Sequence, residues 1–132
     1  MLFLGTYDYY VSELKTASIQ VSEGMVVNDE YNNVRIGANA GQYRTTGTNN
    51  TCFGNQALRY ITKGFENIAI GTNAMVTASG DLVSYNIALG NSSMFTALNC
   101  TRCVCLGYYS GYGIVNAEDC LCVGTLSGFN AQ

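Results

Sequence analysis

The sequence predicts an all-β protein whose chain winds into a parallel β-solenoid of about six coils, most of them 17 residues long. A five-residue unit of the form NIAIG recurs along the last three-quarters of the chain, and its copies end at Gly37, Gly54, Gly71, Gly90, Gly107 and Gly124. The differences between successive glycine numbers are 17, 17, 19, 17 and 17. The 132 residues include 15 glycines and no proline, a composition that favours short strands and tight turns.

Residues 1–31 do not fit this spacing. Apolar and polar residues alternate over 9–14 and 18–27, which predicts two short strands. We interpret this segment as an end cap, a degenerate first coil or an assembly arm, because the terminal units of repeat proteins are commonly atypical. The chain is therefore divided into an N-terminal segment, 1–31, and a solenoid repeat domain, 32–132.

Each repeated strand has two different faces. The residues one and three positions before the glycine are large and apolar in most copies, and we expect them to fill the interior. The residue two positions before the glycine is small and apolar in all but the first copy. We expect these residues to face outwards and to contact a second chain: Cys52, Ala69, Ala88, Cys105 and Cys122. A charge introduced at Ala69 should then break assembly and leave the coil folded.

Asparagine precedes the glycine by four positions in the first four copies, at Asn33, Asn50, Asn67 and Asn86. Identical amides stacked one coil apart can form a hydrogen-bonded ladder, which makes a structural role more plausible than a catalytic one. The one longer repeat carries two extra residues, and we expect them in the loop between Gly80 and Asn86, where they leave the strand spacing undisturbed.

The unit N-[VI]-[RA]-[IL]-G, followed three residues later by Ala or Ser, resembles the head repeats of trimeric autotransporter adhesins. It is equally similar to repeats in tail-fibre and spike proteins of phages and large DNA viruses. The copies NIAIGTNA and NIALGNSS match best, within a resemblance that covers residues 32 to about 131. The resemblance implies a left-handed parallel β-roll that trimerises around a three-fold axis. The long coils and the cysteines fit the viral fibre proteins better than the bacterial adhesins.

Four of the six cysteines fall in the last two coils, where Cys103 and Cys105 precede Cys120 and Cys122 by 17 residues. Three interpretations remain open: small buried thiols, disulfides that join Cys103 to Cys120 and Cys105 to Cys122, or a metal site. A metal site is the weakest of the three, because a C-x-C pair on a strand lacks the turn that gathers zinc ligands. We therefore expect no metal and no cofactor.

Tyr108, Tyr109 and Tyr112 lie close together in the run GYYSGYG and mark a corner that could contact a sugar ring or another subunit. Enzyme chemistry has little support, since the chain has no histidine and its nine carboxylates are scattered. A glycosidase could use two carboxylates alone, either Asp81 with Glu66 or Glu118 with Asp119, but we interpret these residues as solvated loop charges.

Six basic and nine acidic residues give a net charge of −3, which argues against nucleic acid and anionic membranes as partners. The apolar run that begins the sequence is too short for a secretory leader or a membrane span. We expect a non-enzymatic structural assembly module, a homotrimer in a virion fibre, spike or other extracellular appendage. Two alternatives remain: a trimeric adhesin head that binds a receptor or glycan, and a head-to-tail filament subunit that uses its N-terminal arm.

Overall fold

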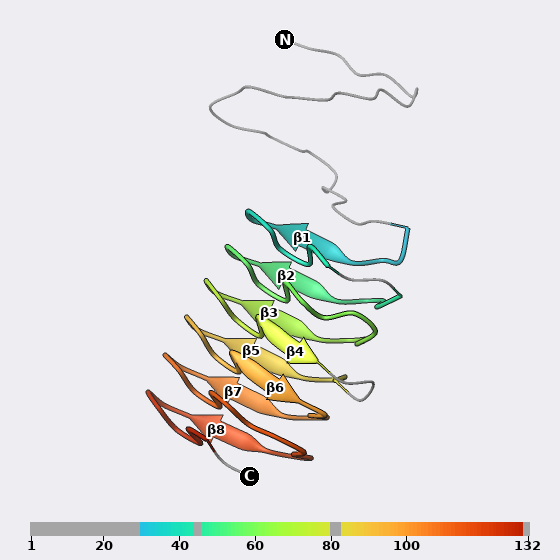
Figure 1. The fold of residues 1–132 in the computed structure, drawn as a ribbon. Coiled ribbons are helices and arrows are strands. Elements are labelled where there is room, and N and C mark those ends of the chain that lie inside the picture. Colours follow the sequence, from blue (N-terminus) through green and yellow to red (C-terminus); the bar gives the residue numbers. More distant parts are fainter. Residues whose placement is uncertain (1–29, 44–45, 80–82, 131–132) are drawn as a thin grey trace, which may run out of the picture.

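The computed structural model of the chain describes residues 30–43, 46–79 and 83–130 (Figure 1). Within these ranges the chain forms short parallel strands and no helix, so the predicted all-β solenoid is confirmed. Each strand has three residues: β1 (Val34–Ile36), β2 (Thr51–Phe53), β3 (Ile68–Ile70), β4 (Thr77–Ser79), β5 (Ile87–Leu89), β6 (Thr96–Leu98), β7 (Val104–Leu106) and β8 (Leu121–Val123). The expected cap or arm lies almost wholly outside the described residues.

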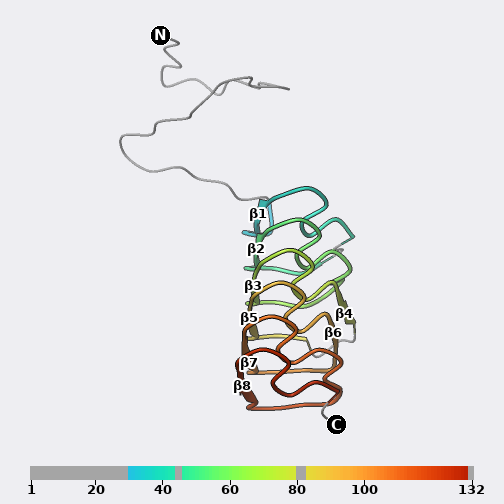
Figure 2. The ribbon, with the colours of Figure 1, turned by 90° about the vertical axis from the view of Figure 1, so that its left-hand side faces the viewer.

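Six of the strands form one parallel sheet in the order β1-β2-β3-β5-β7-β8. Each strand pairs with the strand of the next coil, as Thr51 with Ile68 and Val104 with Leu121. The other two strands, β4 and β6, pair with each other in a second parallel sheet. Figure 2 shows the six strands along one side of the stacked coils and β4 and β6 on the opposite side.

The two extra residues of the longer repeat leave the strand register undisturbed, as the sequence predicts. Pairing partners are 19 residues apart from Ile68↔Ile87 through Ser79↔Leu98. At Ser84↔Thr101 the offset has returned to 17. The insertion therefore lies between Ser79 and Ser84, and the strand register on either side of it is unchanged.

The predicted asparagine ladder is confirmed, and it runs through the interior. The Asn67 side chain donates from Nδ2 to Oδ1 of Asn50 at 3.0 Å and to the Val83 carbonyl at 3.0 Å. Its own Oδ1 accepts the backbone N–H and the Nδ2 of Asn86, both at 3.1 Å. The same pattern joins Asn33 to Asn50. Each buried amide thereby has hydrogen-bond partners for both its nitrogen and its oxygen, and it fixes the position at which the next strand begins.

The repeated glycine lies where two coils touch backbone to backbone. Gly71 has φ = +135°, and a Cβ built on it would lie 2.5 Å from the carbonyl oxygen of Gly90. A side chain is excluded here both by the backbone conformation and by the next coil. The same contact recurs at Gly37, Gly54, Gly90 and Gly107, and Gly124 shares the positive φ; the two constraints explain why this residue does not vary among the six copies.

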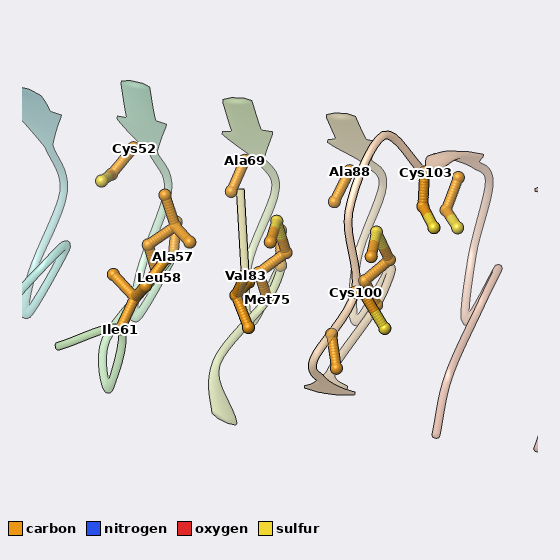
Figure 3. Packing of buried hydrophobic residues seen from close by; sticks show 14 of the residues in the cluster. Cys52, Ala57, Leu58, Ile61, Ala69, Met75, Val83, Ala88, Cys100 and Cys103 are labelled. Atoms are coloured by element: carbon orange, nitrogen blue, oxygen red, sulfur yellow. The ribbon is translucent and has the colours of Figure 1, made fainter. Parts of the chain in front are cut away.

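The predicted orientation of the strands is wrong. The five small residues expected to face outwards lie inside the solenoid, with exposed fractions from 0% for Ala69, Ala88 and Cys105 to 9% for Cys122. Figure 3 shows Cys52, Ala69 and Ala88 facing the same interior as Leu58 and Met75. The interior of one coil is narrow, and Leu58, Met75 and Met94 already fill it from the turn after the strand. Small strand residues leave room for these larger side chains.

Two neighbouring coils fill their interiors with different combinations of large and small side chains. The coil of β5 places Ala88, Met94 and Ala97 in the core, all fully buried. The next coil has Cys105, Gly111 and Ile114 at the corresponding positions. A Cβ on Gly111 would collide with the Cys105 sulfur and come within 2.8 Å of the Ile114 Cδ1. Between these two coils the larger strand residue is therefore matched by a glycine in the turn, and the summed side-chain volume of the three positions stays nearly constant.

Replacement of Asn67 by alanine should destabilise the fold by roughly 2–5 kcal/mol, because the Asn86 N–H and the Val83 carbonyl lose buried partners. Urea unfolding followed by circular dichroism measures the change. The matched control is Asn55→Ala, at an exposed turn residue, which should alter the free energy of unfolding by no more than about 0.5 kcal/mol. Equal effects of the two substitutions would contradict a stabilising ladder.

Gly111→Met should destabilise the protein by about 1–3 kcal/mol or more through overpacking against Cys105 and Ile114. The triple exchange Cys105→Ala, Gly111→Met and Ile114→Ala copies the composition of the preceding coil and should recover most of that loss. Met94 already adopts the required positive φ of 49° at the corresponding position. Thermal unfolding compares the variants, and a triple variant no more stable than Gly111→Met would refute the volume exchange.

Candidate assembly surface

The outward side of the six-stranded sheet carries two columns of apolar side chains. The outer face, as we call it, consists of two residues from each strand: Val34, Ile36, Thr51, Phe53, Ile68, Ile70, Ile87, Leu89, Val104, Leu106, Leu121 and Val123. Thr51 is its one polar member, and none of the twelve is charged. Exposed fractions reach 40% for Ile70, 51% for Phe53 and 72% for Leu121.

Along both margins of the outer face the exposed turn residues are polar, apart from Ala38, Tyr85 and Tyr108. Exposed residues just before the strands include Asn49, Glu66 and Arg102, and exposed residues just after the repeated glycines include Asn55 and Thr72. An uncharged apolar centre with a polar rim is the arrangement found at protein–protein interfaces. The distribution of polarity therefore points to the centre of the sheet, and not to its margins, as the contact region.

The extent of the outer face is unusual for a surface that meets water. Strands in a sheet are spaced about 4.8 Å apart, so six of them present a strip on the order of 25 Å long. A continuous apolar patch of several hundred Å² is at the upper end of what a soluble monomer exposes, and such patches commonly mark interaction sites. Covering each 100 Å² of it contributes about 2.5 kcal/mol before the costs of association.

The five residues that the sequence assigns to an outward contact surface are buried. Cys52, Ala69, Ala88, Cys105 and Cys122 form a continuous column, as predicted, yet that column is part of the core. The outer face consists instead of the residues first assigned to the interior. The parity of the asparagines could have revealed this, because Asn67 and Ala69 are two residues apart on an extended segment and share a face.

The predicted tyrosine cluster is real and larger than expected. Tyr109 lies 5.2 Å from Tyr112 and 4.5 Å from Tyr108, measured between ring centroids. Tyr112 is also stacked between Phe95, at 5.4 Å, and Phe129, at 5.1 Å. Both faces of the Tyr112 ring are therefore occupied by rings from neighbouring coils. Since sugars stack on ring faces, this arrangement stabilises the corner more directly than it forms a sugar site.

Two further surface groups link neighbouring coils. Arg102 binds Asp119 through Nε at 2.6 Å and Glu118 at 3.1 Å, and the Arg102 guanidinium lowers the pKa of the Asp119 carboxyl. Tyr43 and Tyr60 stack at 5.0 Å, with the Arg59 guanidinium beside both rings. Sequence reasoning missed both groups. Arg102 and Asp119 are 17 residues apart, as are Tyr43 and Tyr60, so the repeat spacing could have indicated both contacts.

The structure describes three of the four carboxylates considered for catalysis. Glu118 and Asp119 are both engaged by the same exposed arginine. Glu66 is exposed at a turn with φ = +56°, and its proposed partner Asp81 lies outside the described residues. These contacts agree with the interpretation of these groups as surface charges.

All six cysteines are free thiols in the structure, and four of them lie in the last two coils. Cys103 and Cys120 continue the asparagine column, and the backbone N–H of Cys103 donates to Oδ1 of Asn86 at 2.9 Å. Burial and a contact with Cys122 raise the pKa of Cys105. In the part of the chain that the structure describes, no group of three or more Cys, Asp or Glu side chains is arranged to hold a metal ion. The predicted disulfide pairs stay predictions.

Comparisons with known proteins found no match for this chain, whether among family models, curated proteins or solved structures. A search of the described residues for membrane-spanning helices finds none of sufficient length and hydropathy. The class of protein is therefore defined by its fold alone, a repeat protein of the parallel β-solenoid type.

Proposed function

We propose that the protein is a non-enzymatic structural module that assembles through the outer face of its six-stranded sheet. The observation that carries this proposal is the uncharged apolar strip on β1, β2, β3, β5, β7 and β8, which is bordered by mostly polar turns. Seven of its twelve side chains are exposed by 36% or more in the single chain, and a partner molecule would remove this apolar surface from water.

A second copy of the same chain is the partner whose surface best matches the outer face. Two solenoids with equal coil spacing can interdigitate their side-chain columns along the whole strip, and every level of one copy meets a level of the other. A partner without this repeat could match only a few levels. Three copies around a three-fold axis would bury all the strips at once, and the resemblance of the NIAIG repeat to trimeric adhesin heads and viral fibres favours this number.

A homotrimer of short, stiff solenoids suits a segment of a virion fibre, spike or other surface appendage. The adhesin alternative has less support, because the rings best placed to stack on a sugar are stacked on each other. The filament alternative depends on the N-terminal arm, residues 1–29 of which lie outside the described part of the chain. Self-assembly through the outer face is the function that the described residues support best.

The substitution Ile70→Glu tests the proposal. Ile70 lies at the centre of the outer face and is 40% exposed, so the coil should tolerate glutamate while the assembled face should not. Sedimentation equilibrium of the whole protein should give about three times the 14.2 kDa of one chain. We expect Ile70→Glu to weaken association by about 100-fold or more and to keep the β-sheet circular dichroism signal.

Two neighbouring positions provide controls. Thr72→Glu adds the same charge at the polar margin and should leave the assembly intact. Ala69→Glu buries the charge in the core and should unfold the chain, the opposite of what the outward orientation of Ala69 predicted. A wild-type monomer at micromolar concentration, or an Ile70→Glu protein of unchanged mass, would refute self-assembly. A stable dimer would refute only the trimer.

A further inference from the structure

The two margins of the outer face differ in chemistry. The strand-start margin, as we call it, consists of the exposed residues five positions before the repeated glycines: Asn32, Asn49, Glu66, Tyr85, Arg102 and Asp119. The strand-end margin consists of the exposed residues directly after these glycines: Ala38, Asn55, Thr72, Asn91, Tyr108 and Thr125. Charged residues occur only on the strand-start margin. Its one cation, Arg102, lies in the same coil as Tyr108, the one aromatic residue of the strand-end margin.

Contacts within the chain hold the Arg102 guanidinium in a fixed orientation. Its Nε donates to Oδ1 of Asp119 at 2.6 Å, and its Nη2 donates to Oε2 of Glu118 at 3.1 Å. These N–H groups point outward in the plane of the guanidinium, so the two carboxylates do not cover its flat faces. The Arg102 side chain stays 51% exposed. An oriented, exposed guanidinium is suited to stack on an aromatic ring.

Tyr108 is the ring of the tyrosine cluster that is most available to a partner. It meets Tyr109 edge to face, with the ring centroids 4.5 Å apart, and it is 53% exposed. Tyr112, by contrast, is stacked on a ring on each side. Within one chain, Tyr108 and Arg102 stand at opposite ends of β7. The Tyr108 ring is therefore placed for a contact with Arg102 of another copy.

The centre of the outer face does not by itself determine how two copies align. Five of its six strands carry only Val, Ile and Leu, so a copy displaced by one coil, about 4.8 Å, still covers aliphatic side chains with aliphatic side chains. Such a displacement, repeated at each contact, builds an open spiral in place of a closed ring. An assembly of defined size therefore benefits from a contact that distinguishes one coil from the next.

Rotation about an axis parallel to the stack of coils brings the strand-start margin of one copy against the strand-end margin of the next, level by level. No two like charges meet, because the strand-end margin is uncharged. We propose, on the basis of the self-assembly proposed above, that Tyr108 of one copy stacks on the Arg102 guanidinium of the next copy and thereby fixes the register of the assembled solenoids. A displacement by one coil would place Asn91 or Thr125 opposite Arg102 instead.

A mixture of two variants tests this contact between chains. Tyr108→Lys removes the ring and places a cation opposite Arg102 of the next copy, so this variant alone should associate about tenfold more weakly than the wild type. Arg102→Glu supplies the opposite charge. In an equimolar mixture the introduced lysine faces the introduced glutamate, and native mass spectrometry should show a ratio of mixed to unmixed assemblies about fivefold above the statistical value. The excess should shrink as the ionic strength of the mixing buffer rises.

Three further variants serve as controls. Tyr108→Phe keeps the ring and should associate as the wild type does. Asn55→Lys adds the charge to the same margin three coils away, so its mixture with Arg102→Glu should stay at the statistical ratio. Thr72→Glu faces Glu66 of the next copy but removes no ring, and it should weaken association by no more than about threefold, because exposed charge pairs contribute little.

Circular dichroism checks that every variant is folded. If the wild type assembles and Ile70→Glu dissociates, a statistical ratio in the mixture of Tyr108→Lys with Arg102→Glu would overturn the stacking contact and leave the proposed assembly standing. An equal excess in the Asn55→Lys mixture would also overturn the contact, because it would show a general attraction of opposite charges. A monomeric wild type would overturn both the contact and the assembly.

Discussion

The structure depends on a column of buried amides. Strands of three residues are too short to define a register by their own pairing, and the turns between them place non-glycine residues at positive φ, such as Asn49, Glu66 and Tyr85. The asparagine ladder supplies what the strands lack, because each Oδ1 accepts the N–H that starts the next strand and each Nδ2 holds a carbonyl of the following loop. Coil spacing, strand start and turn shape are therefore set together.

Repeat spacing was sufficient to predict the solenoid, the ladder and the place of the insertion, because each depends on distances along the chain. The orientation of the strands could not be predicted from hydrophobicity, because residues such as Ala69 and Ile70 are both apolar. What decides it is volume: the interior accepts Met75 from the turn only if the strand residue is small. The side-chain groups of Arg102 and Arg59 depend on which turn positions face the same way, which the strand pattern does not specify.

Different constraints act on side chains in the core and on side chains of the outer face. Inside the coils of β5 and β7, side-chain volume is exchanged between strand and turn, because Cys105 is paired with Gly111 where the previous coil pairs Ala88 with Met94. Outside, no such exchange occurs, and aliphatic or aromatic residues repeat at every level. A core residue is constrained by its own coil, whereas an outer-face residue has no constraint within the chain. Its apolar character therefore supports the proposed contact with a second chain.

Extra residues between Ser79 and Ser84 lengthen a coil without changing its strand pairing. Two additional residues there leave the pairing of β3 with β5 and of Ser84 with Thr101 in register. Further lengthening would cost mainly loop-closure entropy, which grows by only about 0.6 kcal/mol for each doubling of loop length. This position, directly after β4 in the sequence, is therefore a natural site for grafting a foreign peptide.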